Sequence, residues 1–248
     1  MRSAAAGIPR LRRDRRRPRR RRARAPLADA QGDQRHPEPQ PCRDPRGDGV
    51  GRRRCDRAVA GAFGHGPEGG RAPSLTALVA RFTLIALAEF PLLASRLSDD
   101  GSEIVTFDGV NLGVAADTPR GLMVPVIPRA HELTVDALDA QLRELAETAR
   151  AGRMPAERLQ GSTFTLNNYG GFGVDGSAAI INHPEVAILG IGRMIERPWV
   201  VDGQIVARRI AQLSLVFDHR VCDGGYAAGF LRRVVELFEH PLRAFGRI

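Results

Sequence analysis

The chain has 248 residues and a formal net charge of +9 at pH 7. This length allows one folded domain with an additional segment. All 37 basic residues are arginine, which excludes a Schiff-base lysine and a lysine that carries biotin or a lipoyl group.

The positive charge is concentrated in residues 1–72, which contain 20 arginines and 8 acidic residues. Residues 73–248 contain 17 arginines and 20 acidic residues. The first segment has no sustained hydrophobic period, so we predict that residues 1–72 are disordered. A nucleic-acid or membrane-surface arm is the functional alternative, but no aromatic residues interleave the arginine runs. The Arg/Pro/Gly/Ala mixture also resembles off-frame translation of GC-rich DNA, with the native frame resuming near Pro73.

Cys42, Cys55 and Cys222 have no metal-ligand spacing, and their odd number gives no disulfide framework. A reducing, cytoplasmic location is therefore expected. No apolar run reaches the roughly 18 residues that a membrane span needs. The basic N-terminus lacks the apolar stretch of a secretory signal. We predict no metal site and no membrane association.

Regular patterns begin at Ser74, which can cap a mostly apolar, buried helix that extends to Phe90. Strands are expected at about 103–107, 111–116 and 121–127. Asp108-Gly109 predicts a hairpin between the first two. Pro125 in the third strand and Pro128 directly after it favour a sheet edge.

Thr134 begins a second, amphipathic helix that ends near Gly152. A strand then enters the glycine-rich stretch 170–176. A phosphate cradle is disfavoured there because no Gly-Lys-Ser/Thr follows, and a turn with positive φ is the better interpretation. Extended segments are expected at 186–195, 199–201 and 204–216, with a hairpin turn at Asp202-Gly203. A last helix should cover 224–239.

Residues 213–225 read as a strand, a polar turn and the start of this last helix. His219 follows the strand, where an imidazole could accept and return a proton near neutral pH. Spacing alone leaves a surface or structural histidine as the alternative.

Several motifs carry a family resemblance. They lie, in chain order, at Asn111–Ile127, Thr163–Gly170, Asn182–Arg193 and His219–Gly224. Together they resemble the dihydrolipoamide acyltransferases, the core subunits of 2-oxo acid dehydrogenase complexes. Chloramphenicol acetyltransferases share a related motif, with a second histidine at the position of Asp218. The resemblance implies an α/β, chloramphenicol acetyltransferase-like two-layer sandwich, in which a mixed sheet has helices on one side. It places the catalytic domain at 73–248.

The resemblance also implies the reaction and its residues. An acyl group passes between dihydrolipoamide and coenzyme A, with His219 as the base. Asn167 occupies the position of the family's oxyanion-stabilising Ser or Thr, and an Asn amide can also donate a hydrogen bond. As the alternative, Asn167 is a loop residue that bonds to the local backbone. Asp223 corresponds to an acid that pairs with an arginine of an N-terminal helix; as the alternative, it is only a helix N-cap. That helix has no match before Pro73, so we expect an incomplete N-terminus. Arg220 is expected to be structural.

The implied partners are coenzyme A as substrate and a lipoyl group supplied by another chain or domain. A homotrimer within a larger core is expected, with active sites between subunits and with the other dehydrogenase-complex subunits bound. Neither a specific nucleic acid nor a membrane is expected. The motifs favour the branched-chain type, although acetyl transfer stays open. The alternative is an inactive truncated remnant or a structural core subunit of the same fold. A third hypothesis is an arginine-tailed nucleic-acid-binding protein.

Overall fold

The computed structural model describes residues 20–26, 50–54, 72–118, 121–241 and 244. Two strands fall where the sequence predicts disorder. β1 (Arg20–Pro26) pairs with β4 (Glu103–Phe107), and β2 (Val50–Arg54) pairs with β11 (Gln204–Phe217). Strand pairing uses backbone groups, so it needs no hydrophobic period in the added segment. The rest of the disorder prediction, for the remainder of 1–71, lies outside the described residues.

An eight-stranded mixed sheet forms the centre of the molecule. Its order is β10-β11-β9-β8-β5-β6, with β2 beside β11 and β7 beside β5. The β5–β8 and β8–β9 pairs are parallel, and the other pairs are antiparallel. The strands are β5 (Leu112–Thr118), β6 (Gly121–Met123), β7 (Val126–Ile127), β8 (Phe164–Asn168), β9 (Ala187–Ile191), β10 (Ile195–Val201) and β11 (Gln204–Phe217). The segment 121–127 is thus two short strands against β5, at the expected edge.

The expected hairpin at Asp108-Gly109 is wrong. The strand before it, β4 (Glu103–Phe107), belongs to a separate three-stranded sheet with β1 and β3 (Arg96–Leu97), whereas β5 lies in the large sheet. Gly109 has φ 106°, and a Cβ there would lie 2.0 Å from Cε1 of His131. Nδ1 of His131 also accepts a hydrogen bond of 3.1 Å from the Val110 backbone N–H. This close approach, rather than strand pairing, explains the glycine.

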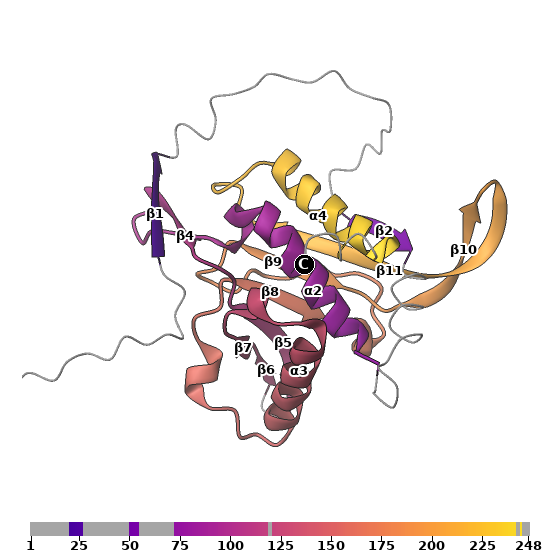
Figure 1. Cartoon of the computed structure of the whole chain (residues 1–248), viewed down its shortest axis with the longest axis horizontal. Helices are drawn as coiled ribbons and strands as arrows, with labels where there is room; N and C mark the ends of the chain where they lie inside the picture. The colour runs from indigo at the N-terminus through magenta and orange to yellow at the C-terminus, as the bar shows by residue number, and fades with distance from the viewer. Residues whose placement is uncertain (1–19, 27–49, 55–71, 119–120, 242–243, 245–248) are drawn as a thin grey trace, which may run out of the picture.

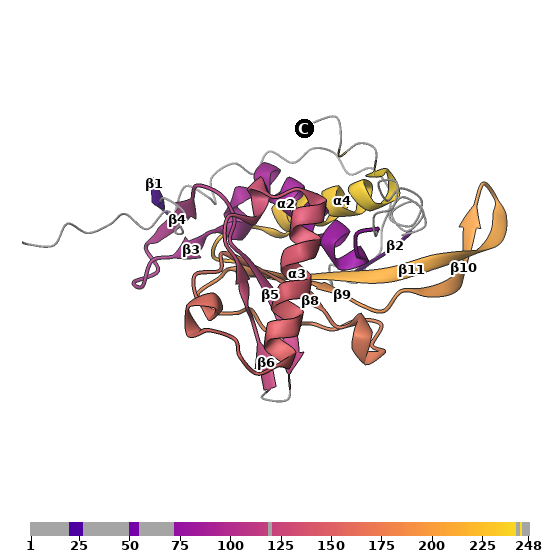
Figure 2. The same ribbon diagram turned by 60° about the horizontal axis from the view of Figure 1, so that its bottom comes forward.

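Three helices cover one face of the large sheet (Figures 1 and 2): α2 (Leu75–Glu89), α3 (Val135–Arg150) and α4 (Gly224–Glu239). Each begins after a side chain that accepts a hydrogen bond from the backbone N–H three residues later, supplied by Ser74, Thr134 and Asp223. Short 3-10 turns lie at Pro91–Ala94, Ala130–Glu132, Ala156–Leu159 and Gly170–Phe172. No helix in the described ranges is long and apolar enough to cross a bilayer.

The hydrophobic core lies between the helices and the sheet. Phe230 of α4 is fully buried, and its ring centroid is 5.8 Å from that of Phe164 on β8. The apolar face of α4 packs into this core, and its buried residues include Ala227, Phe230, Leu231, Val234, Leu237 and Phe238. The two-layer α/β sandwich is confirmed.

The β10–β11 hairpin extends away from the rest of the domain (Figure 2). Asp202 and Gly203 both have positive φ, at 51° and 78°, as a tight hairpin turn requires. Val200 and Ile205 face each other across the hairpin and are 65% and 77% exposed. The hairpin therefore ends in a projecting apolar tip.

Candidate active site

His219 lies in a tight turn between β11 and α4. The turn begins where the Asp218 backbone N–H donates to the Val186 carbonyl at 2.8 Å, and it closes where the Val221 N–H donates to the Asp218 carbonyl at 2.9 Å. The imidazole of His219 is exposed, and its centroid is 4.5 Å from that of Phe217. Among the described residues it has no hydrogen-bond partner, so the side chain is accessible to an incoming thiol.

Asp218 and Arg220 stabilise this turn from either side of His219. The Arg220 guanidinium donates to both carboxylate oxygens of Asp218, at 3.0 Å and 2.7 Å, and the Arg220 backbone N–H donates to the same carboxylate at 2.9 Å. The hydrogen bond from Arg220 lowers the pKa of Asp218, partly opposed by burial. This geometry agrees with the structural role expected for Arg220.

Asn167 lies near the carboxyl end of β8 and is half-buried. Its neighbours Phe164, Leu166 and Asn168 face the helices: the first two are in the core, and the Asn168 amide donates to Oγ1 of Thr76 on α2 at 3.1 Å. Alternation along the strand places Asn167 on the opposite face. Within the described part of the chain, its side-chain amide has no partner. Local backbone bonding, the alternative considered for Asn167, occurs instead at Asn168, which accepts from the Gly170 N–H.

His219 and Asn167 lie at opposite ends of the sheet. Asn167 is level with Gly190 on β9, and Gly190 is level with Ser214 on β11. Phe217, the last residue of β11, is three positions beyond Ser214, or about 10 Å at the usual rise along a strand, and His219 follows two positions later in the turn. β8 is also two strands away from β11, or about 10 Å across the sheet. Two side chains at this separation cannot both contact one reacting carbonyl group. A single chain therefore does not bring together the base and the oxyanion donor that the sequence predicts.

Asp223 is the N-cap of α4, with its carboxylate accepting from the Tyr226 N–H at 2.8 Å. No arginine of the described ranges forms an ion pair with it. Asp223→Ala is expected to lower the free energy of unfolding by about 1 kcal/mol, the usual value of such a cap. Urea denaturation would measure this loss, with Asp99→Ala, at an exposed turn residue, as a control. An unchanged midpoint would contradict the capping role.

Cys222 is half-buried behind the same turn, and burial, with Asp223 and Asp218 nearby, raises its pKa to about 11. The thiol therefore stays protonated until the pH approaches that value, whereas in the unfolded chain it ionises from about pH 8.5. We expect iodoacetamide to alkylate Cys222 at pH 8 about a hundredfold more slowly in the native protein than in urea. Peptide mass spectrometry would follow the modification. Equal rates would show that the thiol is accessible and ionised.

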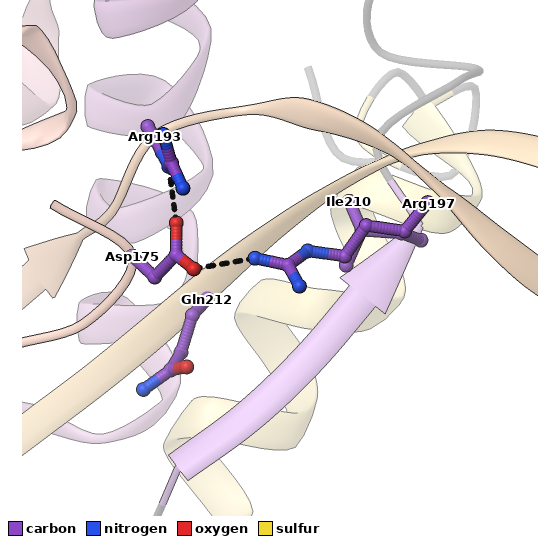
Figure 3. A pocket seen from close by; sticks show the side chains of 5 residues that line it. All are labelled: Asp175, Arg193, Arg197, Ile210 and Gln212. Atoms are coloured by element: carbon purple, nitrogen blue, oxygen red, sulfur yellow. Dashed lines mark hydrogen bonds and ion pairs between the residues drawn. The ribbon is translucent and has the colours of Figure 1, made fainter. Parts of the chain in front are cut away.

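The glycine-rich stretch expected as a turn is a structural loop. Gly173 has φ 74°, and the Arg193 N–H donates to the Val174 carbonyl at 2.9 Å. The Asp175 carboxylate lies between Arg193 and Arg197, 2.5 Å from Nη2 of the latter (Figure 3). Hydrogen bonding to Arg193 lowers the pKa of Asp175. The cavity beside this cluster, also lined by Ile210 and Gln212, has a volume of about 10 Å³ and is the size of one water molecule. It is too small for a substrate.

Comparison with known proteins decides the family. A model described as 2-oxoacid dehydrogenases acyltransferase (catalytic domain) matches residues 65–246. The chain belongs to this acyltransferase family. The match begins a few residues before the boundary expected at residue 73, and it includes every motif that carried the resemblance.

Individual members of the acyltransferase family are also similar to this chain in sequence. The lipoamide acyltransferase component of a branched-chain alpha-keto acid dehydrogenase complex from Pseudomonas aeruginosa is 42% identical over 179 residues, which are 71% of this chain and 42% of that protein. The acetyltransferase component of a pyruvate dehydrogenase complex from Acholeplasma laidlawii is 42% identical over 165 residues, which are 66% of this chain and 30% of that protein. The chain thus spans less than half the length of these two relatives.

Solved acyltransferase structures share the fold. The dihydrolipoamide acetyltransferase of Azotobacter vinelandii is 31% identical with a TM-score of 0.74, over 79% of this chain and 82% of that one. The cubic core of a pyruvate dehydrogenase multienzyme complex gives the same TM-score at 32% identity, over the same shares of the two chains. A chloramphenicol acetyltransferase, at 17% identity and a TM-score of 0.50 over 76% of this chain and 86% of that one, shows the fold alone.

Proposed function

We propose that this chain transfers an acyl group between dihydrolipoamide and coenzyme A, with His219 as the base. The observation that carries the proposal is the exposed imidazole of His219, held on a turn that Asp218 and Arg220 fix on both sides. The Azotobacter vinelandii enzyme was studied for the catalytic roles of a serine, a histidine and an asparagine. The serine lies 52 positions before that histidine, and the asparagine four after it. Asn167 and Asp223 have these same spacings from His219.

The proposed reaction needs a base because a thiol is mostly protonated at neutral pH. His219 removes the proton from the thiol of coenzyme A, and the thiolate sulfur forms a bond to the thioester carbon of the acylated dihydrolipoamide. The carbonyl oxygen becomes an oxyanion, to which the Asn167 amide donates a hydrogen bond. When the original carbon–sulfur bond breaks, His219 returns the proton to the dihydrolipoamide sulfur. The products are acyl-coenzyme A and free dihydrolipoamide.

The separation of His219 from Asn167 supports an active site shared by two subunits. A ring in which each subunit offers His219 to one neighbour and Asn167 to the other would complete every site, as in a homotrimer. The exposed Val200 and Ile205 at the tip of the β10–β11 hairpin would be covered by a neighbouring subunit. Such trimers would assemble further into the core of a 2-oxo acid dehydrogenase complex, in the cytoplasm, together with the other subunits of that complex.

The lipoyl group would come from another chain or domain, because this chain has no lysine to carry it. We propose a branched-chain acyl group as the substrate. The motifs at Thr163–Gly170 and Asn182–Arg193 and the likeness to the Pseudomonas aeruginosa protein support this choice. Acetyl transfer is the second candidate, because the Acholeplasma laidlawii protein is equally identical over a slightly shorter stretch.

The test is an acyl-transfer assay with free dihydrolipoamide and two acyl donors, isobutyryl-coenzyme A and acetyl-coenzyme A, in which chromatography follows the conversion of each donor to free coenzyme A. We expect both to react and the branched donor to have the higher kcat/KM. A higher kcat/KM for acetyl-coenzyme A would reverse the substrate assignment and leave the acyl transfer in place. No turnover with either donor, from folded protein, would favour the alternative of an inactive structural subunit.

A further inference from the structure

Glu185 is a buried carboxylic acid for which the proposed reaction has no direct use. It lies just before β9 and is 5% exposed. One carboxylate oxygen accepts from the Ser162 hydroxyl and, at 3.0 Å, from the Asn182 amide; the other accepts from the Thr165 hydroxyl at 2.6 Å. Burial raises the pKa of Glu185, and the three donors oppose this shift. A buried acid with so complete a set of donors joins the segments that supply them.

Glu185 binds to the strand that carries Asn167, and it precedes the residue that supports the His219 turn. Thr165 is on β8, two residues before Asn167 and on the same face. Glu185 itself precedes Val186, whose carbonyl accepts from the Asp218 N–H at the start of the His219 turn. The carboxylate therefore connects β8 directly to the backbone on which this turn rests.

Further contacts surround this connection. Val186 packs with Val221 of the turn and with Ile104 in a small apolar cluster separate from the main core. On the other side of Glu185, Nη2 of Arg96 donates to the Ser162 carbonyl at 2.6 Å. A shift of residues 185–186 would therefore move both the hydrogen bond and the apolar support beneath His219. Arg96 and the Glu185 carboxylate therefore both bind Ser162, Arg96 at the carbonyl oxygen and Glu185 at the hydroxyl group.

We propose that Glu185 is a positioning residue, which fixes the His219 turn relative to β8 and thereby places the imidazole at the acyl-transfer site. This inference rests on the proposed function of His219. Three donors bind the two oxygens of Glu185, and only a carboxylate has two acceptor oxygens that can satisfy all three. A glutamine of the same size would present an N–H₂ group to one of these donors and so weaken one side of the connection.

Glu185→Gln is therefore expected to lower kcat about 10–100-fold while KM stays nearly constant, since small displacements of a catalytic group have effects of this size. Hydrogen exchange, followed by mass spectrometry, should become faster in the peptide covering 217–222 and stay unchanged in α3. Thr165→Val, which removes one donor and keeps the side-chain shape, should give a smaller change in the same direction. Glu157→Gln, at an exposed glutamate, is the matched control and should change neither quantity.

Unchanged kcat and unchanged exchange at 217–222 in Glu185→Gln would overturn the inference. Faster exchange throughout the domain would overturn it as well, because Glu185 would then serve stability alone. The same conclusion would follow if Glu185→Gln did not fold and Thr165→Val had wild-type kcat and exchange. If the wild-type chain showed no acyl transfer, the proposed function would fail. Local exchange at 217–222 would still decide whether Glu185 holds the turn.

Discussion

Replacing His219 by alanine is expected to lower kcat for acyl transfer by about 10²–10⁴-fold, the usual contribution of a positioned general base. The reason is chemical, because no other group on the turn can take the proton. Asp218 is paired with Arg220, and Cys222 holds its own proton to about pH 11. The folded state should change little, since the imidazole is exposed and packs at the surface against the ring of Phe217.

Steady-state assays that follow the formation of free coenzyme A by chromatography would measure this loss. His240→Ala, at the far end of α4, is the control and should retain wild-type kcat. Thermal unfolding of both variants would separate loss of chemistry from loss of structure. A His219→Ala protein that turns over at the wild-type rate would rule out His219 as the base.

Asn167→Ala is expected to lower kcat by about 10²–10³-fold, as the loss of one oxyanion donor does in other acyl-transfer enzymes. KM should change little because the hydrogen bond strengthens only as charge develops on the oxygen. Asn167→Ser should keep substantial activity, since a hydroxyl can also donate. Asn168→Ala should instead lower stability, because the Asn168 side chain donates a hydrogen bond to Thr76 and accepts one from the Gly170 N–H. Wild-type turnover by Asn167→Ala would remove it from the mechanism.

The sequence predicts much of this fold because its helices carry local signals. Ser74, Thr134 and Asp223 each precede an apolar run of helical period, and each caps the helix expected there. The hairpin prediction at Asp108-Gly109 is wrong because the glycine is required by the close packing of His131, which lies 22 residues further along the chain. Strands β1 and β2 were missed since backbone pairing leaves no side-chain pattern.

In the candidate site, too, the sequence predicts the local structure but not the contacts between distant segments. The strand–turn–helix pattern around His219 is local, so the sequence places it correctly. The distance from Asn167 depends on the register of β8, β9 and β11, which no local pattern contains. Glu185 was overlooked as well, because its partners Ser162 and Thr165 are about 20 residues away and look unremarkable in sequence.

The most direct test of a shared active site is to mix the two inactive variants. His219→Ala and Asn167→Ala proteins would be denatured together, refolded at equal concentration and assayed. If each site takes His219 from one subunit and Asn167 from its neighbour, random mixing should restore about a quarter of the wild-type rate, since that fraction of interfaces receives both intact residues. A mixture no more active than the two variants assayed apart would contradict the shared site and would require both residues to act within one chain.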